Sequence, residues 1–124
     1  MTGSNAQRLK GRRVLVVEDQ YLVAEEVRRM IVTLGGEVVG PVPRSGPALS
    51  MLRREAVDLA VLDINLGPED VYSLAAELNR RNVPFIFATG CEPWVIPDEF
   101  RGAPRIDKPL TSRTFLDALQ RVAI

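Results

Sequence analysis

Acidic residues stand at the ends of two apolar runs in this sequence. The run at 12–19, RRVLVVED, finishes on Glu18 and Asp19, and the run at 57–63, VDLAVLD, finishes on Asp63. If the two runs are neighbouring parallel strands, their carboxyl ends meet at the edge of a sheet where α/β proteins bind ligands. Carboxylates that close together repel one another, and a bound cation relieves the repulsion. Oxygen ligands without histidine or thiolate favour Mg²⁺, with Mn²⁺ as the alternative.

Two further polar groups are predicted to reach the same edge. The run at 83–89 ends at Thr89, with Gly90 behind it, and the run at 103–107 is followed by Lys108. A hydroxyl and an ammonium beside a metal–carboxylate cluster suit a phosphoryl group, because both donate hydrogen bonds to phosphoryl oxygens. One carboxylate can then act as a nucleophile and form an aspartyl-phosphate. Asp63 stands alone at the end of a central strand and is the best placed.

Each of these residues also has a simpler interpretation. Asp19 could cap the following helix, and Asp63 could open a turn. Thr89 could be an ordinary strand residue, and Lys108 could be solvated at the surface. The simpler interpretations do not explain why all four residues fall at strand ends on one edge, and this shared location favours a combined site.

The composition limits the class of protein. A chain of 124 residues corresponds to one soluble globular domain, and its sixteen basic and sixteen acidic residues cancel, so a nucleic-acid partner is not indicated. The absence of histidine excludes imidazole bases and most zinc sites. A single cysteine, Cys91, fits a reducing compartment, and no apolar run reaches the ~18 residues that span a membrane. We expect a cytoplasmic protein with a flexible tail over residues 1–10.

Strand-like runs alternate with stretches of helical periodicity. The strands are predicted at 12–19, 37–42, 57–63, 83–89 and 103–107. The apolar faces of the intervening helices are Val23, Val27, Met30, Ile31 and Leu34; then Ala48, Leu49 and Leu52; then Val71, Leu74, Ala75 and Leu78; and finally Phe115, Ala118, Leu119 and Val122. Gly35 and Gly36 are predicted to end the first helix, and Ser45 to cap the second. The segment 91–100 is ambiguous, because its two prolines weaken a helix.

The proline positions select a strand order. Pro41 and Pro43 lie in or beside the second strand and Pro104 lies in the fifth, and proline is tolerated on edge strands because it cannot donate a ladder hydrogen bond. The fold class is therefore α/β, a doubly wound five-stranded parallel sheet of flavodoxin-like order 2-1-3-4-5.

The segments VLVVEDQ, VLDINLG, FATG and IDKPL resemble the marker segments of response-regulator receiver domains, and the match covers residues 11–124. The resemblance implies that Asp63 is phosphorylated by a sensor histidine kinase or a histidine phosphotransfer protein. It further implies that Asp19, Asp63 and the backbone carbonyl of Asn65 ligate Mg²⁺, with Glu18 acting through a metal-bound water.

The resemblance also assigns the remaining site residues. Thr89, with Gly90, and Lys108 would contact the phosphoryl oxygens, and the bond before Pro109 is expected to be cis. FATG is similar to a receiver subgroup with a Phe-Ala-Thr-Gly run, which often works with stress-linked kinases.

Three features depart from the family pattern. Arg105 stands where an aromatic switch residue is usual, and it is either a charged partner for an acidic surface or a solvated edge residue. The loop after Asp63 reads NLGPED, with glycine where proline is commoner. Cys91 and Glu92 follow FATG, with Trp94 beyond, in a segment that is either the part that moves on phosphorylation or a static loop. Trp94 and Arg105 are candidates for an output surface.

We therefore expect a single-domain response regulator that signals through an unidentified downstream protein, as a monomer or a phosphorylation-dependent dimer, without membrane or nucleic-acid contacts. It is not expected to be an enzyme beyond Mg²⁺-dependent self-phosphorylation and self-dephosphorylation. A small Mg²⁺-dependent phosphatase of haloacid-dehalogenase type is one alternative, although its nucleophile normally lies on the first strand. The other is a receiver that binds partners without being phosphorylated.

Overall fold

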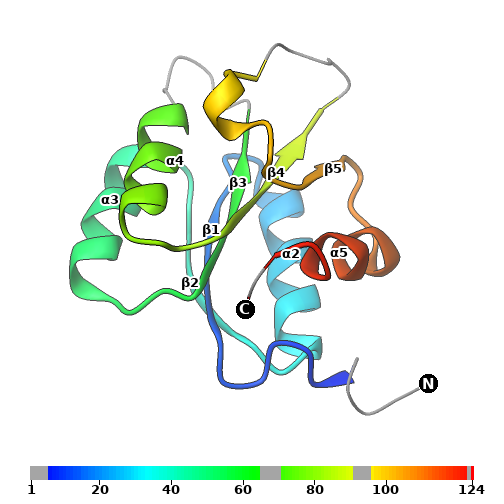
Figure 1. Ribbon diagram of the computed structural model, residues 1–124. Helices are drawn as coiled ribbons and strands as arrows, with labels where there is room; N and C mark the ends of the chain where they lie inside the picture. The colour runs from blue at the N-terminus through cyan, green and yellow to red at the C-terminus, as the bar shows by residue number, and fades with distance from the viewer. Residues whose placement is uncertain (1–5, 65–70, 91–95, 123) are drawn as a thin grey trace.

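The computed structural model describes residues 6–64, 71–90, 96–122 and 124 and shows a three-layer α/β arrangement (Figure 1). The elements in chain order are β1 (Arg13–Val17), α2 (Tyr21–Thr33), β2 (Glu37–Val42), α3 (Ser45–Arg54), β3 (Leu59–Asp63), α4 (Val71–Arg80), β4 (Phe85–Thr89), the 3-10 helix η1 (Asp98–Phe100), β5 (Arg105–Asp107) and α5 (Ser112–Leu119). No helix of the described part has the length and apolar character needed to cross a membrane.

The five strands form one parallel sheet in the order β2-β1-β3-β4-β5. This confirms the predicted fold and the prediction that the second and fifth strands are the edges, although Pro104 lies immediately before β5 and not within it. Gly40, with a φ of 96°, precedes Pro41 in β2 and lies opposite an irregularity between Leu15 and Val17 of β1. Pro41 cannot donate a backbone hydrogen bond, and the edge position accommodates it because β2 pairs with another strand on one side only.

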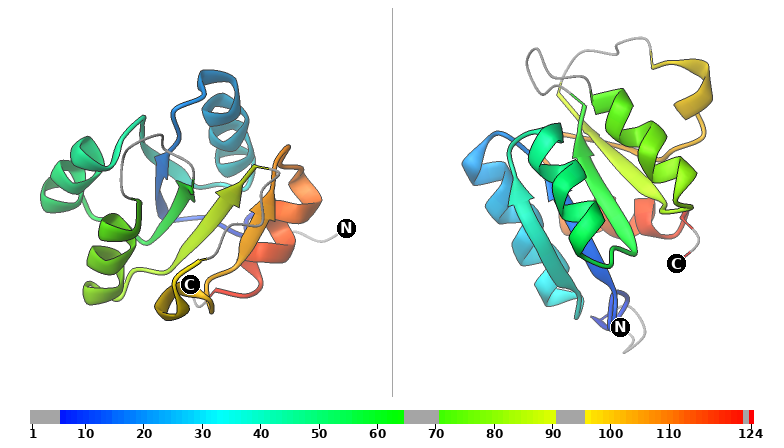
Figure 2. Two further views of the ribbon diagram at one scale, coloured as in Figure 1. Left: turned by 90° about the horizontal axis from the view of Figure 1, so that it is seen from above. Right: turned by 90° about the vertical axis from the view of Figure 1, so that its left-hand side faces the viewer.

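Helices cover both faces of the sheet, α3 and α4 on one and α2 and α5 on the other (Figures 1 and 2). Two apolar clusters form the core, one on each face. The cluster beneath α2 and α5, called the α2/α5 cluster, includes Val27, Ile31, Phe115 and Leu119. The central strands β3 and β4 are buried along their whole length, which is why they appear in the sequence as unbroken apolar runs. On the α4 face, Phe100 of η1 stacks on Tyr72 with ring centroids 5.5 Å apart and packs edge-on against Phe87 of β4.

The predicted apolar helix faces point inward. Val71, Leu74, Ala75 and Leu78 are all buried, as are Phe115, Ala118 and Leu119. The first helix ends at Thr33, just before Gly35 with its φ of 89°, as predicted. Leu49, Met30, Val23 and Val122 are half-buried at the margins of the two clusters.

The prediction that Ser45 caps the second helix is wrong. Arg44 has the extended backbone of an N-cap residue, with φ −142° and ψ 162°, and Ser45 is the first helical residue. Ser45 is buried, and its hydroxyl has no hydrogen-bond partner among the residues that the structure describes. The N-cap position is set by backbone conformation, and the sequence pattern placed this position one residue too late.

The prediction of a flexible tail over residues 1–10 is wrong for its second half. Leu9 is fully buried in the α2/α5 cluster, and its N–H donates to the Leu34 carbonyl oxygen at 2.9 Å. The Arg8 guanidinium donates to the Leu119 carbonyl oxygen at 3.0 Å. A single leucine in a polar stretch has no periodicity, so its burial could not be predicted from the sequence pattern. Residues 1–5 lie outside the described part.

Candidate functional site

Glu18 and Asp19 follow β1 at the carboxyl edge of the sheet. The Glu18 N–H donates to the Val42 carbonyl oxygen at 2.9 Å, so the backbone of Glu18 continues the contact between β1 and β2. Its side chain is 5% exposed and accepts a hydrogen bond from the Gln20 N–H at 3.1 Å, whereas Asp19 is exposed. Asp19 does not cap α2, because Gln20 occupies the N-cap position and makes no side-chain cap.

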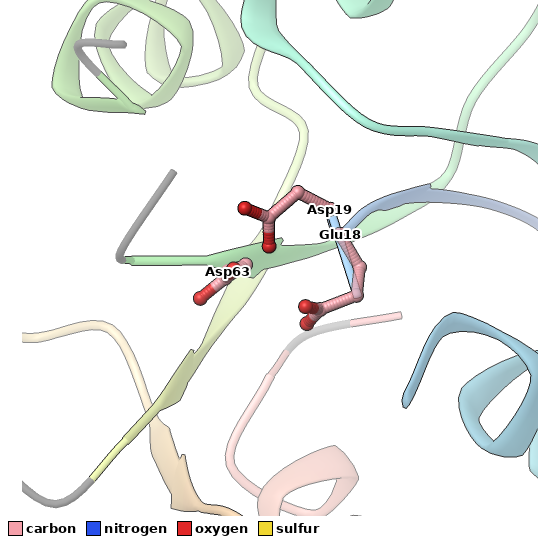
Figure 3. A group of neighbouring side chains, drawn as sticks. All are labelled: Glu18, Asp19 and Asp63. Carbon is pink, nitrogen blue, oxygen red and sulfur yellow. The ribbon is translucent and has the colours of Figure 1, made fainter. Parts of the chain in front are cut away.

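Asp63 is the last residue of β3 and is 1% exposed. The register pairs Val17 with Leu62, so the residues that follow them, Glu18 and Asp63, emerge side by side. One carboxylate oxygen from each of Glu18, Asp19 and Asp63 lies within 4.8 Å of the other two (Figure 3). The predicted convergence of the three carboxylates is present.

Lys108, which directly follows the edge strand β5, brings a positive charge to this acidic cluster. Its Nζ lies 3.1 Å from Glu18 and 3.3 Å from Asp63 Oδ1. Its own N–H donates to the Thr89 carbonyl oxygen at 2.8 Å, and the following Lys108–Pro109 peptide bond is cis. Leu110 is buried in the α2/α5 cluster, and this packing fixes the position of the chain directly after Pro109. These contacts hold the ammonium between two buried carboxylates.

The Glu18 carboxyl has an unusual proton affinity. Burial raises its pKa to about 7, with a further contribution from the Asp63 carboxylate, against the opposing effects of the Gln20 N–H and Lys108. One ammonium therefore does not fully compensate the carboxylates, and the site retains an affinity for positive charge.

The donor set fits a hard divalent cation. Its three clustered groups are all carboxylates, the ligands that Mg²⁺ and Mn²⁺ prefer, and the sequence contains no histidine. Exposed Asp19 leaves the cluster open to solvent on one side, as a cation that keeps several waters requires. The predicted fourth ligand, the carbonyl of Asn65, lies outside the described residues.

Thr89 makes contacts that the sequence did not predict. Its side chain is buried at the end of β4, and Oγ1 lies 3.0 Å from Asp107 Oδ1 and 3.3 Å from the Gly90 carbonyl oxygen. Thr89 and Asp107 are register partners in β4 and β5. Sequence reasoning gave Asp107 no role. The strand order, which pairs the ends of β4 and β5, was the signal that could have identified it.

Of the two residues predicted for an output surface, Arg105 lies in the described part of the chain. Arg105 is exposed on the edge strand β5, as register partner of Phe87. Trp94, with Cys91 and Glu92, lies outside the described residues, as does the loop 65–70.

Comparison with known proteins identifies the family. The model of the response regulator receiver domain family matches residues 14–95. The transcriptional regulatory protein PdtaR of Mycobacterium tuberculosis is 28% identical over 92 residues, which are 72% of this chain and 45% of that protein. The chain thus spans less than half the length of the curated relatives it matches.

Solved structures agree with this assignment. The solution structure of SdrG from Sphingomonas melonis Fr1 has a TM-score of 0.80 and 31% identity, with 98% of each chain covered. The PhyR stress response regulator has a TM-score of 0.77 over 95% of this chain and 47% of its own; at 24% identity it shows a shared fold. With the sheet order, the site at its carboxyl edge and these matches together, the chain belongs to the response regulator receiver domains of two-component signalling.

Proposed function

We propose that the chain accepts a phosphoryl group on Asp63 from the phosphohistidine of a sensor histidine kinase or a histidine phosphotransfer protein, with Mg²⁺ at the neighbouring carboxylates. The observation that carries the proposal is the position of Asp63, a buried carboxylate 3.3 Å from an ammonium and within 4.8 Å of two further carboxylates. A carboxylate in a purely structural ion pair would not need the additional acidic groups.

The transfer is a displacement at phosphorus. A carboxylate oxygen of Asp63 attacks the phosphorus, a P–O bond forms, and the P–N bond to the donor imidazole breaks. The bonding electron pair leaves with the imidazole nitrogen, which takes a proton from solvent. Hydrolysis of the acyl phosphate by water regenerates the Asp63 carboxylate and releases phosphate.

Lys108 and Thr89 act on the transferred group. The Lys108 ammonium, now divided between Glu18 and Asp63, would pair with a phosphoryl oxygen once Asp63 is modified. The Thr89 hydroxyl would donate to another phosphoryl oxygen. Both groups stabilise negative charge that spreads over the phosphoryl oxygens during transfer.

Asp19, Asp63 and the Asn65 carbonyl would hold Mg²⁺, and Glu18 would hold one of its waters. When bound, the ion neutralises the carboxylates and the phosphoryl oxygens. Output would pass through contacts with another protein. The Phe-Ala-Thr-Gly run that ends at Gly90 supports assignment to the receiver subgroup with that run.

The test is intact-mass spectrometry after incubation with Mg²⁺ and acetyl phosphate or a phosphorylated histidine kinase. One added phosphoryl group is expected on the wild type and none on Asp63→Asn, while Asp58→Asn, a change of the same type at the other end of β3, should retain it. Many turnovers of phosphate esters would instead favour the phosphatase. Failure of every donor to give an adduct would refute the proposal.

The metal ligands are tested separately by calorimetric titration of Mg²⁺. Asp19→Asn should weaken Mg²⁺ binding and phosphorylation together, because it removes a charged ligand from the cluster. The matched control is Asp117→Asn, which removes an exposed carboxylate from α5. Equal Mg²⁺ affinity in wild type and Asp19→Asn would exclude Asp19 as a ligand.

A further inference from the structure

The Thr89 hydroxyl can donate only one hydrogen bond, and the groups around it indicate which acceptor receives that bond. Within hydrogen-bond distance of Oγ1 lie Asp107 Oδ1 at 3.0 Å and the Gly90 carbonyl oxygen at 3.3 Å. Both are acceptors, so the hydroxyl must donate to one of them. The shorter contact is to a carboxylate, which is also the stronger acceptor. In this state the proton is directed toward the edge strand.

The backbone holds the two side chains opposite each other. Thr89 and Asp107 are register partners at the ends of β4 and β5, and the adjacent Lys108 N–H donates to the Thr89 carbonyl oxygen at 2.8 Å. Thr89 is buried, whereas Asp107 is exposed on the edge strand. The strand register therefore fixes the backbone positions of both residues, from which the two side chains reach each other.

We propose that Asp107 is a positioning residue that competes with the phosphoryl group for the Thr89 hydroxyl. The inference rests on the proposed function and deepens it. Phosphoryl oxygens only accept hydrogen bonds, so Thr89 must break its bond to Asp107 before it donates to them. Asp107 thus stabilises the unphosphorylated arrangement of Thr89, and phosphorylation leaves its carboxylate without this donor on the exposed edge of β5.

The first test measures the affinity for beryllofluoride, a phosphoryl mimic, in the presence of Mg²⁺ by ¹⁹F NMR. Loss of a competing hydrogen bond in Asp107→Ala should tighten binding about three- to tenfold, the factor that corresponds to one net hydrogen bond. Asp117→Ala, which removes an exposed carboxylate from α5, should leave the affinity unchanged.

A double-mutant cycle separates competition from simple charge repulsion. In a Thr89→Ala background there is no hydroxyl to compete for, so Asp107→Ala should then have no effect on beryllofluoride affinity. The same tightening with and without the hydroxyl would show that Asp107 acts through its charge and would overturn the proposal.

The second test needs no phosphoryl group. In the unphosphorylated protein the α–β proton coupling of Thr89 should report one side-chain rotamer, and Asp107→Ala should change it toward an average over several. Averaging in the wild type would overturn the proposal.

Absence of a beryllofluoride complex in the wild type would refute the proposed function, and the competition with it. A complex formed equally well by wild type and Asp107→Ala would refute only the competition.

Discussion

Glu18 should make the metal-free protein lose stability as the pH rises. In the folded state its pKa is about 7, against 4.5 for an ordinary glutamate. At pH values between these two pKa values, the folded protein binds more protons than the unfolded chain, so the free energy of unfolding falls with increasing pH. The pKa difference of about 2.5, at about 1.36 kcal/mol for each unit, corresponds to a loss on the order of 3 kcal/mol, most of it between pH 5 and pH 8.

The perturbation that isolates this effect is Glu18→Gln, which keeps the shape of the side chain and removes the titration. Urea unfolding of both proteins in EDTA at several pH values gives the free energy of unfolding of each. The stability of the wild type relative to Glu18→Gln should decline through this range. Carboxylates away from the site, such as Glu77 with a pKa lowered by its hydrogen bonds to Arg81 and Arg80, contribute equally to both proteins and cancel.

The matched control is Glu26→Gln, which changes an exposed glutamate of α2. Its stability should run parallel to that of the wild type at every pH. If the difference between wild type and Glu18→Gln is the same at pH 5 and pH 8, the carboxyl ionises at its ordinary pKa, and the reasoning from burial and the Asp63 charge is refuted.

Three further predictions concern packing and capping, each measured as the free energy of urea unfolding. Leu9→Ala should cost about 2–5 kcal/mol because it empties a buried site, whereas a flexible segment would show no cost. Gly36→Ala should cost about 1–3 kcal/mol, because its Cβ would lie 2.8 Å from Ile31 Cγ2; Gly46→Ala, with nothing within 4 Å, should be neutral or stabilising and serves as the control. Thr111→Ala should cost about 1 kcal/mol by removing the side-chain cap that accepts from the Thr114 N–H of α5, and an unchanged stability would argue against the cap.

Several parts of this protein were predictable because their cause is local in the sequence. Alternation of apolar runs and helical periodicity identified the strands and the inward faces of the helices, and the positions of Pro41 and Pro104 identified the edge strands. Once the strand order was known, the acidic residues at the ends of the first and third strands had to meet. Each step depends only on the residue types within one element and on the rules that join elements.

The tertiary structure decided the features that depend on residues far apart in the chain. Leu9 is buried because Leu34 and the α2/α5 cluster provide its site, and the pKa of Glu18 is raised by burial and by Asp63. The hydrogen bond from Thr89 to Asp107 joins residues eighteen positions apart, through the register of two strands. Residue types placed the chemical groups at one edge of the sheet, but distances and burial set their charge state and hydrogen-bond partners, and these are determined only when the chain has folded.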